Sequence, residues 1–178
     1  MAQIVLDRLQ RKFGAAVHAT HGEHGNETVV VDRPRLVEVA EFLKVDRELA
    51  FDMPIDCTVV DWQGNREPRF DVVYHIYSTK RHHRLRLKAL VPESDPTCPS
   101  LTSVWPGMNW HEREAWDLYG VRFVGHPNLR RILLYEEFVG HPLRKDYPID
   151  RRQPLVSMRP VVEVPTQRNP PAELLNKP

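Results

Sequence analysis

Proline is distributed unevenly along this chain of 178 residues, and its positions limit where long helices and strands can form. All but three of the 16 prolines lie at or after position 92; the exceptions are Pro34, Pro54 and Pro68. Proline fixes φ and lacks a backbone N–H, so it interrupts regular structure. The chain is therefore expected to divide into an α+β domain at residues 1–91, a helix and loop region at 92–150, and an extended Pro-rich tail at 151–178.

Hydrophobic periodicity predicts the elements of the first region. Two helices are expected, at residues 4–13 and from Asp32-Arg-Pro34 onward. Strands are expected at residues 15–20, 28–32, 55–62, 69–77 and 83–91. In the last of these, Leu85, Leu87 and Ala89 share one face, and Arg84, Arg86 and Lys88 share the other. The pattern favours an α+β fold with a small mixed, largely antiparallel sheet and helices packed on one face.

Composition excludes several classes of protein. The formal net charge is +1, which is too small for a broad nucleic-acid-binding surface. No apolar run approaches the length of about 18 residues that spans a bilayer, and the N-terminus has no apolar segment of a secretory signal. Cys57 and Cys98 are far apart and form no C-x-x-C pair, so we expect two reduced thiols and no iron–sulfur cluster in this chain.

The window from Asn109 to Pro148 is the most unusual part of the sequence. We expect a helix that begins at Asn109, with Glu112 completing a capping box, and that ends at Gly120 as the C′ residue. The pentapeptide Phe-Val-Gly-His-Pro then occurs twice, at residues 123–127 and 138–142. We interpret the two copies as similar turns that bracket the short apolar run 132–135.

The histidines of this window permit a second hypothesis, a stand-alone metal-dependent hydrolase. His111-Glu112 resembles the start of an H-E-x-x-H zinc motif, but Ala115 occupies the position of the second histidine. A zinc site would instead need His111, His126 and His141 to converge. The alternative for both Gly-His-Pro sequences is a turn whose imidazole bonds nearby backbone.

The charged residues also have two interpretations. Glu112, Glu114 and Asp117 could serve in acid–base chemistry, but carboxylates on a helix are more often members of ion pairs, and Arg113 and Asp117 have the i,i+4 spacing of a surface pair. The basic pairs could contact RNA phosphates, but nearby acidic residues offset them. These pairs are Arg130-Arg131, Arg144-Lys145 and Arg151-Arg152.

Aromatic residues and arginines are concentrated together from position 105 onward, and both are enriched at protein interfaces and in cores. The aromatic residues are Trp105, Trp110, Trp116, Tyr119, Phe123, Tyr135, Phe138 and Tyr147. Because prolines pre-organise an extended segment, we favour a docking surface for a partner protein.

The same window resembles a known family. Glu112-Arg-Glu-Ala-Trp-Asp-Leu-Tyr119, followed by Gly120 to Gly125, His126, Arg130 and Ile132-Leu133, is similar to the signature of the thirty-kilodalton subunit family of respiratory complex I, the bacterial NADH-quinone oxidoreductase. Gly140-His-Pro-Leu-Arg-Lys-Asp-Tyr-Pro148 is also similar to that family.

The resemblance implies a non-catalytic subunit of the peripheral arm of a bacterial complex. It implies no cofactor in this chain, with NADH, FMN, iron–sulfur clusters and quinone in partner subunits, and packing chiefly on the large subunit of the quinone site. It also implies no nucleic acid, membrane contact only through partners, and a location on the cytoplasmic side of the inner membrane. A homologous subunit of a membrane-bound hydrogenase or of an F420-linked dehydrogenase stays an alternative.

The resemblance also assigns structural and interface roles to twelve residues. They are Glu112, Arg113, Glu114, Asp117, Tyr119, Gly120, His126, Arg130, Arg131, Arg144, Asp146 and Tyr147.

Overall fold

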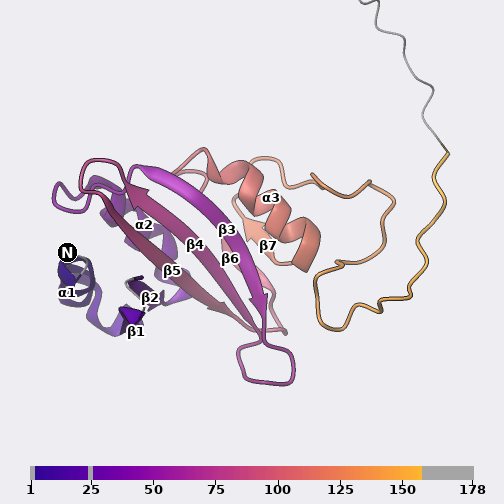
Figure 1. Ribbon diagram of the computed structural model, residues 1–178, viewed down its shortest axis with the longest axis horizontal. Helices are drawn as coiled ribbons and strands as arrows, with labels where there is room; N and C mark the ends of the chain where they lie inside the picture. Colours follow the sequence, from indigo (N-terminus) through magenta and orange to yellow (C-terminus); the bar gives the residue numbers. More distant parts are fainter. Residues whose placement is uncertain (1–2, 24–25, 158–178) are drawn as a thin grey trace, which may run out of the picture.

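The protein is described from a computed structural model covering residues 3–23 and 26–157 (Figure 1). Helix α1 spans Gln3–Phe13 and α2 spans Leu36–Val45. Short 3-10 helices at Gly14–Ala16 and Arg33–Arg35 lead into β1 and α2. Most of the predicted tail, residues 158–178, lies outside the described residues, so the prediction of an extended tail stays a prediction.

A five-stranded mixed sheet forms the centre of the molecule, in the order β1-β2-β5-β4-β3. Only the contact of β2 with β5 is parallel; the other three pairs are antiparallel. The strands are β1 at Val17–His21, β2 at Thr28–Val31, β3 at Met53–Asp61, β4 at Phe70–Ser78 and β5 at His83–Val91. The α+β class, the mixed sheet and the β1–β2 hairpin are therefore confirmed, and the predicted bounds of the last strand are those observed.

One face of the sheet is apolar because alternate side chains along each strand point to the same side. In Figure 1, α2 lies behind the sheet, and Val39, Ala40 and Leu43 of α2 are fully buried. Tyr74 and Leu87 are neighbours in the β4–β5 register and are also fully buried in this core. We call this side the inner face and the opposite side the outer face.

The segment after β5 continues the same core. Residues 97–99 form strand β6 (Thr97–Pro99), which pairs in parallel with β7 (Arg122–Val124). The prediction that residues 92–99 are entirely loop is therefore wrong at its end, because Cys98 pairs with Phe123 and both side chains are buried. Helix α3 spans Met108–Tyr119, and its Met108 and Ala115 join the core that the inner face of the sheet forms.

Candidate partner interface

Helix α3 positions the first signature residues. It begins after Gly107, which makes no side-chain capping bond, and it ends at Gly120, where φ is +80° and the backbone N–H donates to Trp116 O. The predicted role of Gly120 is thus confirmed. The predicted capping box of Asn109 and Glu112 is wrong, because the Glu112 side chain turns into the core instead of back to the helix start.

Glu112 is fully buried and fastens α3 to two other segments. Its carboxylate accepts hydrogen bonds from Ser100 Oγ at 2.6 Å, from Leu101 N at 2.7 Å and from the Tyr74 hydroxyl at 3.3 Å. Burial raises the pKa of Glu112 to about 7, although these three donors pull it down. The carboxylate is therefore a structural link between α3, β4 and the loop after β6.

Asp117, one turn before the end of α3, is also fully buried. Its Oδ2 atom accepts three backbone N–H bonds, from Ile132 at 3.1 Å, Leu133 at 3.0 Å and Leu134 at 2.9 Å, while Oδ1 pairs with Arg131. Burial alone would raise the pKa of this carboxyl, but the N–H donors and Arg131 outweigh it and the pKa is lowered. The predicted surface pair of Arg113 with Asp117 is therefore wrong.

Two arginines hold the loop that follows β7. Arg131 Nη2 donates to the carbonyl oxygens of Phe138 at 2.8 Å and Gly140 at 3.0 Å. Arg113 donates from Nε to Arg130 O and from Nη2 to Arg131 O, both at 3.0 Å. Residues 125–150, which we call the wrapped segment, thus follow a fixed path although they contain no helix or strand.

The two Gly-His-Pro sequences are both turns, as predicted, with φ of +86° at Gly125 and +99° at Gly140. His126 Nε2 donates to Asn109 O at 3.0 Å, and its Nδ1 accepts from Asn128 N at 3.1 Å. His141 Nδ1 donates to Asp117 O at 2.9 Å. Both rings therefore bind backbone, and among the described residues no group of His, Cys, Asp and Glu is arranged to hold a metal ion.

A cluster around Arg69 anchors the end of the wrapped segment to the sheet. Arg69 is almost fully buried and donates to both oxygens of Asp61, at 2.9 and 2.8 Å. It also donates to Glu93 at 2.5 Å and to Asp146 at 3.2 Å. The hydrogen bonds to Asp61 are the main reason that the pKa of Arg69 is raised.

Arg144 and Lys145 complete this cluster. Arg144 makes two hydrogen bonds of 3.0 Å to Asp146, and these bonds, with those of Arg69, hold the pKa of Asp146 well below its usual range. The backbone N–H of Lys145 donates to Asp61 Oδ2 at 2.9 Å. The sequence interpretation missed Asp61, Arg69 and Glu93. Asp61 and Arg69 flank the turn after the third predicted strand, and that placement was an available signal.

The remaining signature residues lie near the surface. Tyr147 stacks on Phe138 with ring centroids 6.1 Å apart, and Tyr119 is half-buried at the end of α3. The side chains of Glu114 and Arg130 are exposed. All four signature residues are at least partly accessible from outside the chain.

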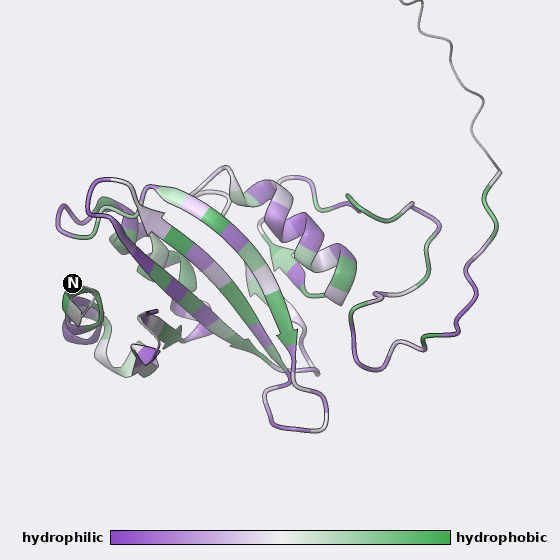
Figure 2. Ribbon diagram, in the orientation of Figure 1, coloured by the Kyte–Doolittle hydropathy of each residue, from purple (hydrophilic) through white to green (hydrophobic). Residues whose placement is uncertain are grey.

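Hydrophobic side chains are exposed along the same part of the molecule. Figure 2 shows hydrophobic residues at intervals among hydrophilic ones after β7. The large exposed ones from α3 onward are Trp110, Val124, Leu133, Tyr135, Val139, Leu143, Ile149, Leu155 and Val156. Because the buried charges of this region are paired internally, the arrangement is that of a braced binding surface rather than of a reactive site.

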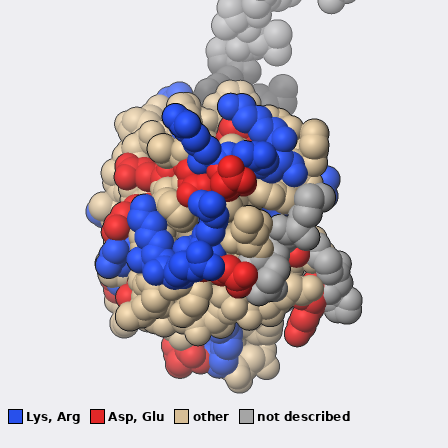
Figure 3. Space-filling view, turned by 90° about the vertical axis from the view of Figure 1, so that its left-hand side faces the viewer, with Lys and Arg blue, Asp and Glu red and all other residues tan. Residues whose placement is uncertain are grey.

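The rest of the surface carries mixed charge. In Figure 3, Lys and Arg side chains lie next to Asp and Glu side chains on one end of the molecule. Arg131 and Arg144, two of the arginines considered for RNA binding, are already hydrogen-bonded within the chain. No helix in the part of the chain that the structure describes has the length and apolar character needed to cross a membrane.

Comparisons with known proteins agree with the signature. The family model described as "Respiratory-chain NADH dehydrogenase, 30 Kd subunit" matches residues 29–153. A subunit of the NADH-quinone oxidoreductase of Geobacter sulfurreducens, designated by the letter C, is 46% identical over 142 residues, which are 80% of this chain and 86% of that protein. The corresponding NADH-quinone oxidoreductase subunit of Roseiflexus sp. is 47% identical over 145 residues, or 82% and 83% of the two chains.

Solved structures give the same result. A trypsin-resistant fragment of Nqo5 is 30% identical and has a TM-score of 0.63, covering 72% of this chain and all of the fragment. A chain of the archaeal membrane-bound sulfane sulfur reductase has a TM-score of 0.67 over 83% of this chain and 85% of its own length, but at 19% identity it shows a shared fold alone. The chain therefore belongs to the 30-kilodalton subunit family of the respiratory-chain NADH dehydrogenase, complex I.

Proposed function

We propose that this chain is a non-catalytic subunit of the peripheral arm of a proton-translocating NADH-quinone oxidoreductase. In this role it packs on the large subunit that forms the quinone site, while NADH, FMN, the iron–sulfur clusters and quinone are bound by partner subunits. It is held at the cytoplasmic side of the bacterial inner membrane through those partners. Matches to subunits of NADH-quinone oxidoreductases over most of their length support this proposal.

The observation that carries the proposal is the construction of the wrapped segment. Its backbone is held by Asp117, Arg131 and Arg113 from inside, and its apolar side chains are left outside. Leu133 is 61% exposed and Val139 is 48% exposed. A rigid loop that displays apolar side chains loses little conformational entropy on binding, which is what a stable contact between two proteins needs.

Substitution of the exposed apolar residues tests this proposal. The double variant Leu133→Asp with Val139→Asp is expected to keep the thermal stability of the isolated chain, because neither side chain contributes to the core. It should lower the amount of assembled complex in membranes at least fivefold, measured by native gel electrophoresis and by NADH-dependent quinone reduction.

The matched control is Val45→Asp, at the end of α2, where the side chain is 77% exposed. This variant should assemble like the wild type. The proposal fails if the double variant also assembles normally, or if the control is equally impaired.

A further inference from the structure

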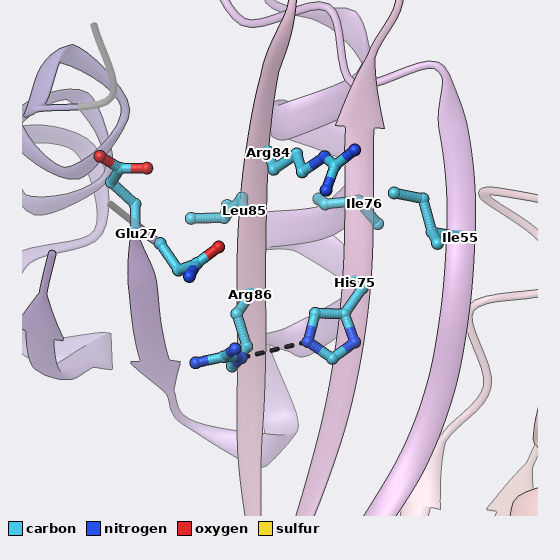
Figure 4. A pocket seen from close by; sticks show the side chains of 8 residues that line it. Glu27, Ile55, His75, Ile76, Arg84, Leu85 and Arg86 are labelled. Atoms are coloured by element: carbon cyan, nitrogen blue, oxygen red, sulfur yellow. Dashed lines mark hydrogen bonds between the residues drawn. The ribbon is translucent and has the colours of Figure 1, made fainter. Parts of the chain in front are cut away.

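The outer face of the sheet holds a small notch that the wrapped segment does not contact. In Figure 1 no helix lies in front of β3, β4 and β5 on this side. The notch has a volume of about 210 Å³, and its lining includes Glu27, Ile55, His75, Arg84 and Arg86. Figure 4 shows that Arg84, Arg86 and His75 extend from neighbouring strands β5 and β4.

Neutral groups hold Arg86 in place. Its Nε donates to His75 Nε2 at 3.1 Å, the bond drawn in Figure 4, and its Nη1 donates to Thr28 Oγ1 at 3.4 Å. Because His75 Nε2 accepts this bond, the imidazole must be neutral at that nitrogen. Burial, together with the nearby Arg86 charge, also lowers the pKa of His75. The guanidinium is therefore oriented without being neutralised.

Arg84 is a second cation without a carboxylate partner. Its guanidinium lies 5.8 Å from the ring centre of Tyr77, and within the described ranges neither Arg84 nor Arg86 forms an ion pair. Lys88 provides a contrast on the same strand and face, since it lies 3.5 Å from Asp71. The carboxylate of Glu27 points away from both guanidinium groups in Figure 4.

The shape of the notch limits what fits it. Pockets for small-molecule ligands are usually about 300 to 1,000 Å³, so this notch is too small for a cofactor and suits one or two side chains. Its cationic side is formed by two arginines, and Ile55 forms part of its apolar wall. An arginine fork matches the geometry of a carboxylate, and the apolar wall matches an adjacent aliphatic side chain.

We propose that this notch binds an acidic side chain of a partner protein, an Asp or Glu that is flanked by an aliphatic residue, at a second docking surface separate from the wrapped segment. The complementary charge would satisfy Arg84 and Arg86, which the chain itself leaves unpaired. A charge pair of this kind, shielded by apolar contacts, contributes most to the choice of partner and its orientation.

Photo-crosslinking in the assembled complex tests the proposal. p-Benzoylphenylalanine in place of Ile55 leaves both arginines intact, and the same probe in place of Leu133 reports on the wrapped segment. After irradiation of membranes, mass spectrometry should find the probe at position 55 joined to a protein segment with an Asp or Glu within about three residues of an aliphatic side chain. A link to lipid, to a segment without a carboxylate, or no link at position 55 overturns the proposal. The proposed function is tested separately by the probe at position 133.

A charge exchange then separates recognition from proximity. Arg84→Glu with Arg86→Gln should lower assembled complex at least threefold, and an Asp→Arg or Glu→Arg change in the cross-linked segment should restore at least half of it. Lys88→Gln is the control, since Lys88 lies on the same face but already faces Asp71; it should leave assembly unchanged. Failure of the exchange to restore assembly, or an equal loss in the control, would sink the proposal. An Arg84→Gln variant with a normal thermal transition keeps a folding defect from being mistaken for lost recognition.

Discussion

Asp117 Oδ1 lies 2.5 Å from Arg131 Nη1, and the other oxygen of the same carboxylate accepts three consecutive backbone N–H groups. Residues 132–134 have no strand or helix partner for these N–H groups, so one side chain supplies the acceptors that regular structure would otherwise provide. The ion pair also orients Arg131 toward Phe138 O and Gly140 O. Asp117 therefore fixes the path of the wrapped segment from a position on α3.

Asp117→Asn is expected to lower the free energy of unfolding by about 3 kcal/mol, because it leaves Arg131 without its buried counter-charge. Hydrogen exchange at the amides of Ile132, Leu133 and Leu134 should become at least tenfold faster. Glu114→Gln, an exposed carboxylate on the same helix, should change stability by less than about 0.5 kcal/mol. Unchanged exchange at these three amides in Asp117→Asn would contradict the role assigned to the carboxylate.

Gly120→Ala should destabilise the protein more than a positive φ alone explains. A Cβ at Gly120 would lie 2.6 Å from His141 Cδ2, whereas a Cβ at Gly64, where φ is +75°, meets nothing within 4 Å. Gly64→Ala is expected to cost about 1 kcal/mol for the left-handed backbone. Gly120→Ala should cost about 2 kcal/mol more, from overpacking against the imidazole, and should shift the NMR signals of His141. Equal losses in denaturant unfolding of the two variants would show that the contact with His141 is unimportant.

Arg69→Met should lower the free energy of unfolding by about 3 to 5 kcal/mol, because buried Asp61 loses both of its arginine hydrogen bonds. Arg66→Met is the matched comparison. Asp71, the partner of Arg66, keeps Lys88 at 3.5 Å, so we expect a loss of about 1 kcal/mol or less. Chemical denaturation at pH 7 distinguishes the two, and a comparable loss in both variants would remove the special role of Arg69.

Glu112 is expected to make stability depend on pH in the opposite sense to the paired aspartates. Its pKa is about 7 in the folded protein and 4.5 is the reference value, so the folded state binds the proton more tightly. The resulting stabilisation is fully present below pH 4.5 and is lost as pH rises through about 7. Over this interval the free energy of unfolding of the wild type should fall by about 3 kcal/mol relative to Glu112→Gln. Parallel pH profiles for the two proteins would show that Glu112 is ionised throughout.

The local signals in the sequence were sufficient for the sheet and for the end of α3. Alternation in residues 83–91 places Leu85 and Leu87 on the buried face, and a positive φ at Gly120 needs no tertiary information beyond the helix before it. The partners of the charged residues were not predictable in the same way. Arg113 and Asp117 have the spacing of a helical pair, but each forms hydrogen bonds with residues that lie 14 to 18 positions later in the chain.

The interface also shows this limit. The signature identifies the family because its residues are unusual in combination, yet Glu112 and Asp117 are buried and internally bonded rather than displayed. Leu133 and Val139, which the predicted set of interface residues did not include, are the exposed ones. A pattern of residue types gives the location of a binding surface, whereas the direction of each side chain depends on packing.

The two identical Phe-Val-Gly-His-Pro sequences carry the imidazole proton on opposite nitrogens. The backbone N–H of Asn128 requires a bare Nδ1 in His126, and the carbonyl oxygen of Asp117 requires a protonated Nδ1 in His141. His126 therefore uses both ring nitrogens within the chain, while His141 keeps Nε2 as a hydrogen-bond acceptor. Copies with the same letters are not chemically interchangeable, since each turn has received its tautomer from a different neighbour.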